Sequence, residues 1–249
     1  MTRVALHAGG ELAIRATRVL LAESGVEVGL FDDESKSGRL HQVEALNEWD
    51  VLVVEEMSAT ARPHIDAAFE LAIPVVLATE TPLLSGPSVT MVVGVLEGAR
   101  LAAALADMGL VTNNELIDAR LAWTVPGPPL TDGEAVTFPD PIGPLWAHRE
   151  PHPTTEFASG GLAAPTDGEW RGITARLTTG SGDGVHQQTY GVVDDRQFLD
   201  GVVLAAAALA AAQGAYPPGH NGPGDSAGVF LRIAQEAGMD IASFAPSRG

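Results

Sequence analysis

In its N-terminal part the chain alternates short, continuously apolar runs with stretches of helical periodicity. Runs that predict strands lie at residues 4–6, 26–31, 51–54, 74–78 and 89–95. Helical patterns run from Glu11 to a glycine cap at Gly25, from 59 to 72 and from 97 to 108. Parallel strands need crossover connections of this kind and are buried on both faces. The alternation therefore predicts an α/β fold built on a doubly wound parallel sheet.

The pattern changes after residue 112. Expected strands follow at residues 117–125, 135–138, 145–148, 170–178 and 185–193, with helices at 196–213 and 227–237. Glycines at 180–184 predict an antiparallel hairpin between the last two strands, and residues 150–169 have the composition of a loop. Asp194 or Asp195 is the expected N-cap of the helix from 196. We expect a first domain at 1–112 and a smaller α+β domain, used for substrate binding or dimerisation, at 113–249.

Charge and composition exclude several classes of function. The chain has 14 Lys and Arg against 32 Asp and Glu, a net charge of −18. A nucleic-acid surface and docking on anionic lipid are therefore disfavoured, because both need basic patches. There is no cysteine, and no pair among the seven histidines has zinc-helix spacing, so no metal site is expected. The longest apolar run, residues 202–212, is too short to span a bilayer, and we expect a cytoplasmic, soluble protein.

The first turn carries the main functional signal. A strand, a glycine pair, a helix, a second strand and then an acid is the order of a Rossmann-like dinucleotide-binding unit. Gly9, Gly10 and Glu11 open the helix, whose N–H groups and dipole favour a pyrophosphate. Asp32, after the second strand, is placed to accept hydrogen bonds from an adenosine ribose. Its acidic neighbours favour NAD over NADP, whereas Lys36 and Arg39 act in the opposite direction.

Two features depart from that fingerprint. His7 stands where the first glycine is expected, and Glu55 and Glu56 follow the third strand, where they would repel an anionic cofactor. His7 is therefore either a catalytic residue at the ligand-binding edge of the sheet or a turn residue satisfied by backbone. The glycine loop either still binds a dinucleotide, or its glycines serve only to form the turn between strand and helix.

The C-terminal half adds a resemblance. Residues 138–144, Phe-Pro-Asp-Pro-Ile-Gly-Pro, resemble an element of saccharopine dehydrogenase-like NAD(P)-binding proteins. The strand pair around 170–190, the Tyr-Gly-Val at 190–192 and the Tyr-Pro-Pro at 216–218 are similar to that family too. The resemblance implies a Rossmann domain, an inserted α+β domain, and substrate in the cleft between them. It also implies that Glu80 corresponds to an acid of the family. Gly94 to Gly98 departs from the family's glycine-proline turn.

These observations lead to competing functions. The first is an NAD(P)-dependent oxidoreductase acting on a small carbonyl or imine, with His148, Tyr190, Glu80 or His7 as acid–base residues. In an alternating strand, a tyrosine such as Tyr190 more often packs in the core or against a neighbouring strand. The second is a Rossmann-derived protein without hydride transfer, a cofactor-free lyase, dehydratase or cyclase using His7, Glu55 or Glu56. The third is a ligand-binding or interaction protein, with a homodimer through the second domain's sheet.

Overall fold

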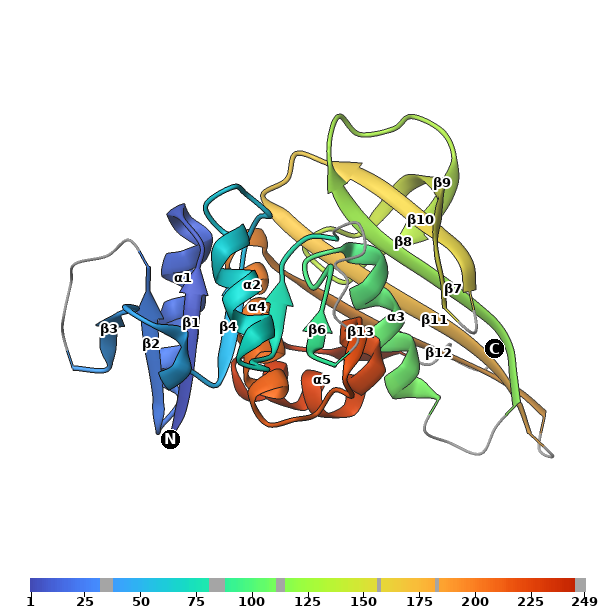
Figure 1. Ribbon diagram of the computed structural model, residues 1–249. Coiled ribbons are helices and arrows are strands. Elements are labelled where there is room, and N and C mark those ends of the chain that lie inside the picture. The colour runs from blue at the N-terminus through green and yellow to red at the C-terminus, as the bar shows by residue number, and fades with distance from the viewer. Residues whose placement is uncertain (32–37, 81–87, 111–114, 156–157, 182–183, 245–249) are drawn as a thin grey trace. The chain divides into compact units, whose positions relative to one another are not determined.

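The computed structural model describes residues 1–31, 38–80, 88–110, 115–155, 158–181 and 184–244. They divide into two compact units. The first unit comprises Met1–Glu97 and Asp200–Gly238, and the second comprises Gly98–Leu199 with the residues from Met239 onward. Each unit contains one seven-stranded sheet (Figure 1). The chain therefore leaves the first unit after Glu97, returns to it at Asp200 and leaves it again after Gly238.

The first sheet is parallel throughout its described pairings, which confirms the predicted doubly wound α/β class. Its order is β3-β2-β1-β4-β5-β6-β13. The strands are β1 (Thr2–His7), β2 (Val26–Leu30), β3 (Leu40–Gln42), β4 (Val51–Val54), β5 (Val75–Leu77), β6 (Thr90–Val92) and β13 (Gly219–Asn221). Strand order reverses between β1 and β4, and open sheets of this kind bind ligands at the carboxyl ends of their strands at that point.

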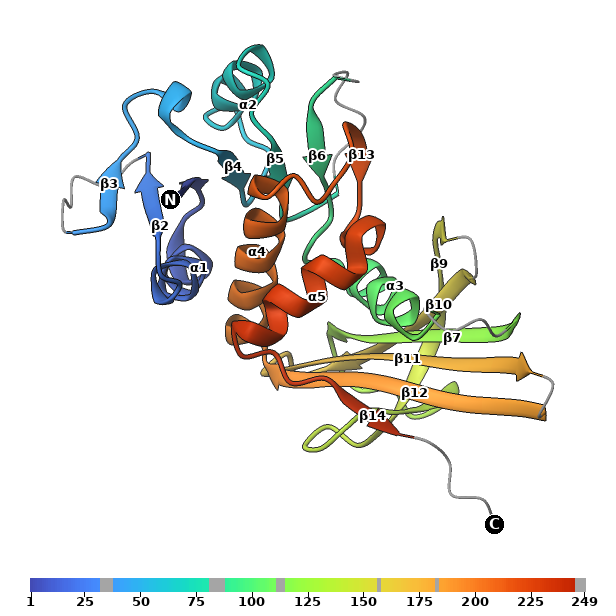
Figure 2. The same cartoon turned by 90° about the horizontal axis from the view of Figure 1, so that it is seen from below.

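Helices cover both faces of this sheet. Figure 2 shows α2 (Arg62–Glu70) on one side and α1 (Gly10–Ala22) with α4 (Arg196–Ala212) on the other. The helices α1 and α4 approach closely, because a Cβ on Gly201 would lie 2.7 Å from the Cβ of Arg15. The unit also contains α5 (Ala227–Glu236) and the short 3-10 helices η1 (Leu46–Glu48) and η2 (Pro223–Ser226).

The predicted end of α1 at Gly25 is wrong by several residues. The helix ends at Ala22, since Glu23 already has an extended backbone, and Gly25 lies in the following turn with φ +81°. The Arg39 guanidinium supplies the cap instead. It donates to the carbonyl oxygens of Leu21, Glu23 and Val26, where a cation also interacts favourably with the helix dipole.

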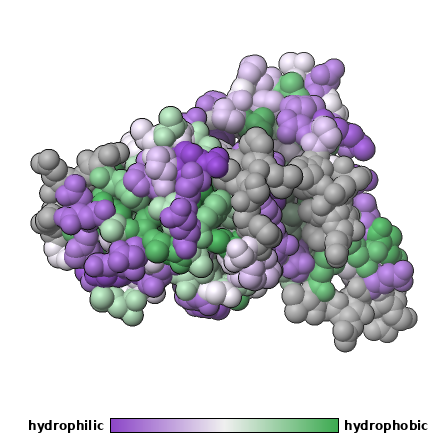
Figure 3. Space-filling view, viewed as in Figure 1, coloured by the Kyte–Doolittle hydropathy of each residue, from purple (hydrophilic) through white to green (hydrophobic). Residues whose placement is uncertain are grey.

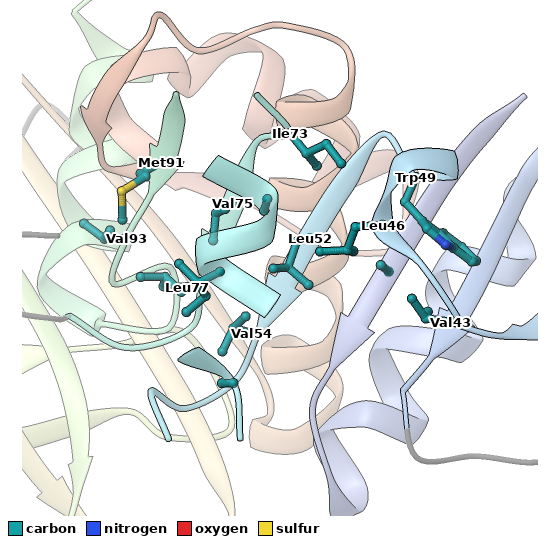
Figure 4. Close-up of a cluster of buried hydrophobic side chains, with 14 residues drawn as sticks. Val43, Leu46, Trp49, Leu52, Val54, Ile73, Val75, Leu77, Met91 and Val93 are labelled. Atoms are coloured by element: carbon teal, nitrogen blue, oxygen red, sulfur yellow. The ribbon is translucent and has the colours of Figure 1, made fainter. Parts of the chain in front are cut away.

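A buried hydrophobic cluster fills the α2 face of the first sheet (Figure 4). It combines strand residues such as Leu52 and Leu77 with Ile65 of α2 and with the Trp49 ring. Gly29 of β2 lies directly against that ring, and a Cβ there would overlap Trp49 and lie 2.5 Å from Val43 Cγ2. The indole therefore occupies space that a side chain on β2 would need.

The second sheet is mixed, in the order β14-β12-β11-β7-β10-β9-β8. Its strands are β7 (Glu115–Pro126), β8 (Glu134–Thr137), β9 (Pro144–Thr155), β10 (Ala158–Thr166), β11 (Trp170–Ser181), β12 (Gly184–Asp195) and β14 (Ala242–Phe244). Among the described strands of this second sheet, only β7 and β10 pair in parallel. Helix α3 (Gly98–Gly109) packs on one face, where its Gly98 contacts Trp123 and its Gly109 contacts Leu177 and Tyr190.

Local predictions in this half had different outcomes. The hairpin of β11 and β12 is confirmed. Asp195 caps α4 as expected, because its carboxylate accepts a hydrogen bond of 2.9 Å from the Phe198 N–H. The loop predicted at 150–169 is wrong: β9 continues into it and β10 fills most of the remainder. Pairing with β7, distant in sequence, holds this Gly- and Pro-containing segment extended.

The described residues contain no helix that is long and apolar enough to cross a membrane. On the face of the first unit seen in Figure 3, hydrophobic residues lie between hydrophilic ones. Ile14 and Leu71 are among the large hydrophobic side chains exposed on this unit. Such scattered apolar exposure is ordinary for a folded domain.

Replacing Gly29 by Ala is expected to destabilise the first unit. The new methyl group would overlap Trp49 and Val43, and overpacking of this kind typically costs about 1–3 kcal/mol. Thermal unfolding of the variant measures the loss. Gly228→Ala is the matched control, because no atom lies within 4 Å of a Cβ there and the residue is helical. Equal unfolding temperatures for both variants would contradict the packing argument.

Candidate functional site

A groove of about 1000 Å³ lies in the first unit beside the first turn of the chain. It is bordered by the carboxyl ends of β1, β2 and β4 and by one side of α1. Its lining residues are Leu6, His7, Ala8, Gly9, Gly10, Ala13, Ile14, Thr17, Arg18, Leu30, Phe31, Leu40, Glu55, Glu56 and Ser58. The groove therefore lies where a doubly wound sheet binds its ligand.

The glycine pair leaves the backbone accessible at the start of α1. A Cβ on Gly9 or on Gly10 would meet nothing within 4 Å. Gly10 has φ +60°, a conformation that glycine adopts without steric cost. Gly9 is the N-cap and has an extended backbone. Because the first N–H groups of a helix have no intrahelical partner, this turn suits an anion that approaches the backbone closely.

Glu55 already interacts with that turn. Its carboxylate accepts a hydrogen bond of 2.9 Å from the Gly9 N–H. The pairing of β1 with β4 positions it, since the Glu55 N–H donates to the His7 carbonyl oxygen at 3.1 Å. Glu55 is half-buried, whereas Glu56 is exposed. A carboxylate of the protein thus occupies a place that the phosphate of a ligand would take.

His7 lies in an aromatic cluster at the same edge of the sheet. Its ring centroid is 5.3 Å from that of His64 and 5.6 Å from that of Phe31. The Phe31 and His64 rings are closer still, with centroids 4.0 Å apart. Two imidazoles and the Glu55 carboxylate therefore surround the end of β1. Sequence reasoning did not select His64, although a helix that follows a parallel strand begins at the carboxyl edge of the sheet, where ligands bind.

Other predicted residues of the first unit lie apart from this cluster. Glu11 is exposed in the first turn of α1 and forms an ion pair of 3.1 Å with Arg15. Glu80 follows β5, and its N–H donates to the Glu97 carboxylate at 2.8 Å. Asp32 lies outside the described residues, so its role stays a prediction. Arg39 is engaged at the end of α1, as described above.

The two candidates in the second unit do not meet each other. His148 of β9 is exposed and pairs with Glu150 at 3.2 Å. Tyr190 of β12 is half-buried and packs against Gly109 of α3. Strands β10, β7 and β11 lie between β9 and β12 in the sheet. The structure thus gives these two residues separate surroundings, and their catalytic roles stay predictions.

The described residues contain no group of three His, Asp or Glu side chains arranged to hold a metal ion. The groove instead offers backbone N–H groups, the imidazole of His7, and the guanidinium of Arg18 with the carboxylates of Glu55 and Glu56. Such groups can bind an anion and exchange protons.

The sheet order and the site at its first turn define a Rossmann-type α/β fold. Neither the family models nor the curated proteins gave a match for this chain. Solved structures with the same fold do match. Saccharopine dehydrogenase (L-Glu forming) from Saccharomyces cerevisiae, solved in the apo form, aligns with a TM-score of 0.61 at 8% identity. This alignment covers 99% of this chain and 100% of that chain.

Two further solved structures are also similar to this chain. Homospermidine synthase from Legionella pneumophila, solved with NAD, has a TM-score of 0.50 at 11% identity and covers 100% of this chain and 93% of its own. A Gfo/Idh/MocA family oxidoreductase from Vibrio cholerae has a TM-score of 0.50 at 11% identity, with 95% of each chain covered. The resemblance to saccharopine dehydrogenase-like proteins is thereby confirmed for the fold.

Replacing Glu55 by Ala is expected to lower the stability of the unliganded protein. The change removes the hydrogen bond to the Gly9 N–H and a negative charge at the N-terminus of α1, and losing a cap of this kind costs about 0.5–2 kcal/mol. Denaturant unfolding measures the effect. Glu56→Ala is the control, because Glu56 is exposed and surface changes usually stay within about 0.5 kcal/mol. An equal loss for both variants would show that the Glu55 contact adds nothing.

Proposed function

We propose that this protein is an NAD(P)-dependent oxidoreductase that acts on a small carbonyl or imine substrate. The observation that carries the proposal is the groove at the switch point of the sheet, with open backbone at Gly9 and Gly10. The volume of about 1000 Å³ is sufficient for a nucleotide-sized ligand. Structures that share the fold include an oxidoreductase and a homospermidine synthase solved with NAD, and this supports the same function.

The glycine turn fits a dinucleotide, and Glu55 opposes it. Gly9 and Gly10 would receive the pyrophosphate, with Arg18 as the nearby cation in the groove lining. The Glu55 carboxylate must then give up its bond to the Gly9 N–H. The nicotinamide supplies the hydride chemistry when bound. His7 and His64 lie at the same edge of the sheet and have side chains that can exchange protons. NAD is favoured over NADP if Asp32 contacts the ribose.

The Glu55 contact also favours a second candidate function. A carboxylate that satisfies the glycine turn removes the need for a phosphate there. With two imidazoles beside it, the same groove would perform acid–base chemistry without a cofactor, as a lyase, dehydratase or cyclase does. The two candidates differ in one measurable property, which is the affinity for a nicotinamide dinucleotide.

Calorimetric titration with NADH and with NADPH tests the proposal. We expect a dissociation constant of about 100 μM or less for one of them, which corresponds to roughly 5.5 kcal/mol. Gly9→Val should abolish this binding, because the added side chain would project into the open space over the turn. The extended backbone of Gly9 accepts valine, so thermal unfolding of the variant serves as its control. Absence of binding at millimolar cofactor would overturn the oxidoreductase proposal and favour the cofactor-free function.

Glu55→Gln should strengthen cofactor binding even though it removes a charge that stabilises α1. Repulsion between two unit charges about 4 Å apart is worth about 1 kcal/mol even at the dielectric constant of bulk water, or roughly fivefold in affinity. Glu48→Gln is the matched control, because Glu48 precedes β4 and lies at the opposite edge of the sheet. Weaker binding by Glu55→Gln than by the native chain would mean that the Glu55 carboxylate assists the cofactor.

A further inference from the structure

The second unit contains a pocket of its own, independent of the function proposed above. It has a volume of about 610 Å³, within the range of small-molecule sites. Residues of β7, β8, β10, β11, β12 and β14 line it together with the Phe138–Pro144 segment. It opens on the face of the sheet that α3 does not cover. Leu177 contacts α3, and successive residues of a strand point to opposite faces, so Arg176 points into the pocket.

Two arginines oppose each other at one end of this pocket. Arg176 of β11 pairs in register with Arg120 of β7, and Thr189 of β12 follows on the other side of Arg176. Like charges placed directly opposite on neighbouring strands destabilise a sheet. Arg120 has a carboxylate neighbour, Asp118, at 3.4 Å. No hydrogen bond or ion pair of the Arg176 side chain occurs within the part of the chain that the structure describes.

Two adjacent arginines in one pocket are unusual for a chain of this composition. Acidic residues outnumber basic ones by 32 to 14, so carboxylates are abundant. Among the charged residues that line the pocket, Asp140 is the acidic one, against the two arginines. The half-buried Arg176 guanidinium therefore faces the pocket with a positive charge that the described residues leave unneutralised. An anionic group on a ligand would relieve the repulsion between the arginines.

The pocket becomes apolar along the strands. Thr174 lies two residues from Arg176 along β11. It pairs with Ala122 of β7, which in turn pairs with Leu162 of β10. Two residues further lies Gly172, against which the Phe138 ring packs. Arg176 and Gly172 are four residues apart on the strand, which corresponds to a distance of about 13 Å along it. Val136 and Pro139 add to the apolar lining, and Asp140 lies in the same segment. Phe244 of β14 also lines the pocket, in the row of Thr189 and Arg176.

From this gradient we propose that the pocket binds a small amphipathic carboxylate. Its carboxylate would lie on the guanidiniums of Arg176 and Arg120, and its hydrocarbon part would extend along β11 toward Leu162 and Phe138. A planar guanidinium binds a carboxylate through paired hydrogen bonds. A hydrocarbon chain of several carbons is required to reach the apolar end, so small inorganic anions would use only half of the pocket.

Isothermal titration of the whole 249-residue chain with octanoate tests the proposal. We expect one octanoate to bind per chain. Octanamide has the same shape without the charge, and acetate has the charge without the chain. Both should bind at least about tenfold more weakly, because each loses either the charge-assisted hydrogen bonds or the apolar contacts. Equal affinity for octanamide would overturn the role of the arginines, and equal affinity for acetate would overturn that of the apolar lining.

Thr189→Glu tests the placement of the ligand without a risk to the fold. Thr189 is paired directly with Arg176, and an opposite charge across two strands stabilises a sheet. The new carboxylate would neutralise Arg176, so octanoate affinity should fall at least about tenfold while the unfolding temperature is kept. Arg176→Gln should give the same loss of affinity. Arg62→Gln, an exposed arginine of α2 paired with Asp66, is the charge-matched control. Absence of octanoate binding, or unchanged binding by Thr189→Glu, would overturn the proposal.

Discussion

The parallel pairing of β1 with β2 on one side and β4 on the other determines how the site is built. Because all three strands point the same way, their carboxyl ends meet at one edge of the sheet. The ladder continues past β4 through the bond between the Glu55 N–H and the His7 carbonyl oxygen. This one register holds the glycine turn, the histidine cluster and the Glu55 carboxylate together. Slipping it by one residue would turn the side chains after β4 to the other face.

The sequence predicts β1, β2, β4, β5 and β6 of the first sheet, because their signals are local, whereas β3 has no predicted counterpart. The apolar run 51–54 matches β4 residue for residue, and Asp195 caps α4 as its residue type suggests. Strand β10 is the opposite case. Its Gly, Ala and Pro residues have little β propensity of their own, and pairing with β7 and β9 makes it a strand. Such non-local pairing leaves no local pattern. The same applies to β13, which joins the first sheet from the far end of the chain.

Within the candidate site, the sequence predicts the turn that borders the groove better than the side chains around that turn. Gly9, Gly10 and His7 follow from the order of a strand, a turn and a helix. The contact of Glu55 with Gly9 and the approach of His64 to His7 depend on register and on the angle of α2, which no single segment encodes. The Glu55 contact also couples stability to function, because the carboxylate that supports α1 competes with any anionic ligand. Stability and binding should therefore respond oppositely to its removal.

The passage of the chain out of the first unit at Glu97 and back at Asp200 affects its synthesis. Chains fold from the N-terminus while the ribosome still makes the remainder. The strands from β1 to β6 emerge first, but α4, which packs on α1, and β13, which pairs with β6, are made only after the entire second unit. During that interval one face and one edge of the nascent sheet lack their covering. Molecular chaperones that bind apolar surface would meet this protein at that stage, and interruptions of translation after Glu97 would prolong its exposure.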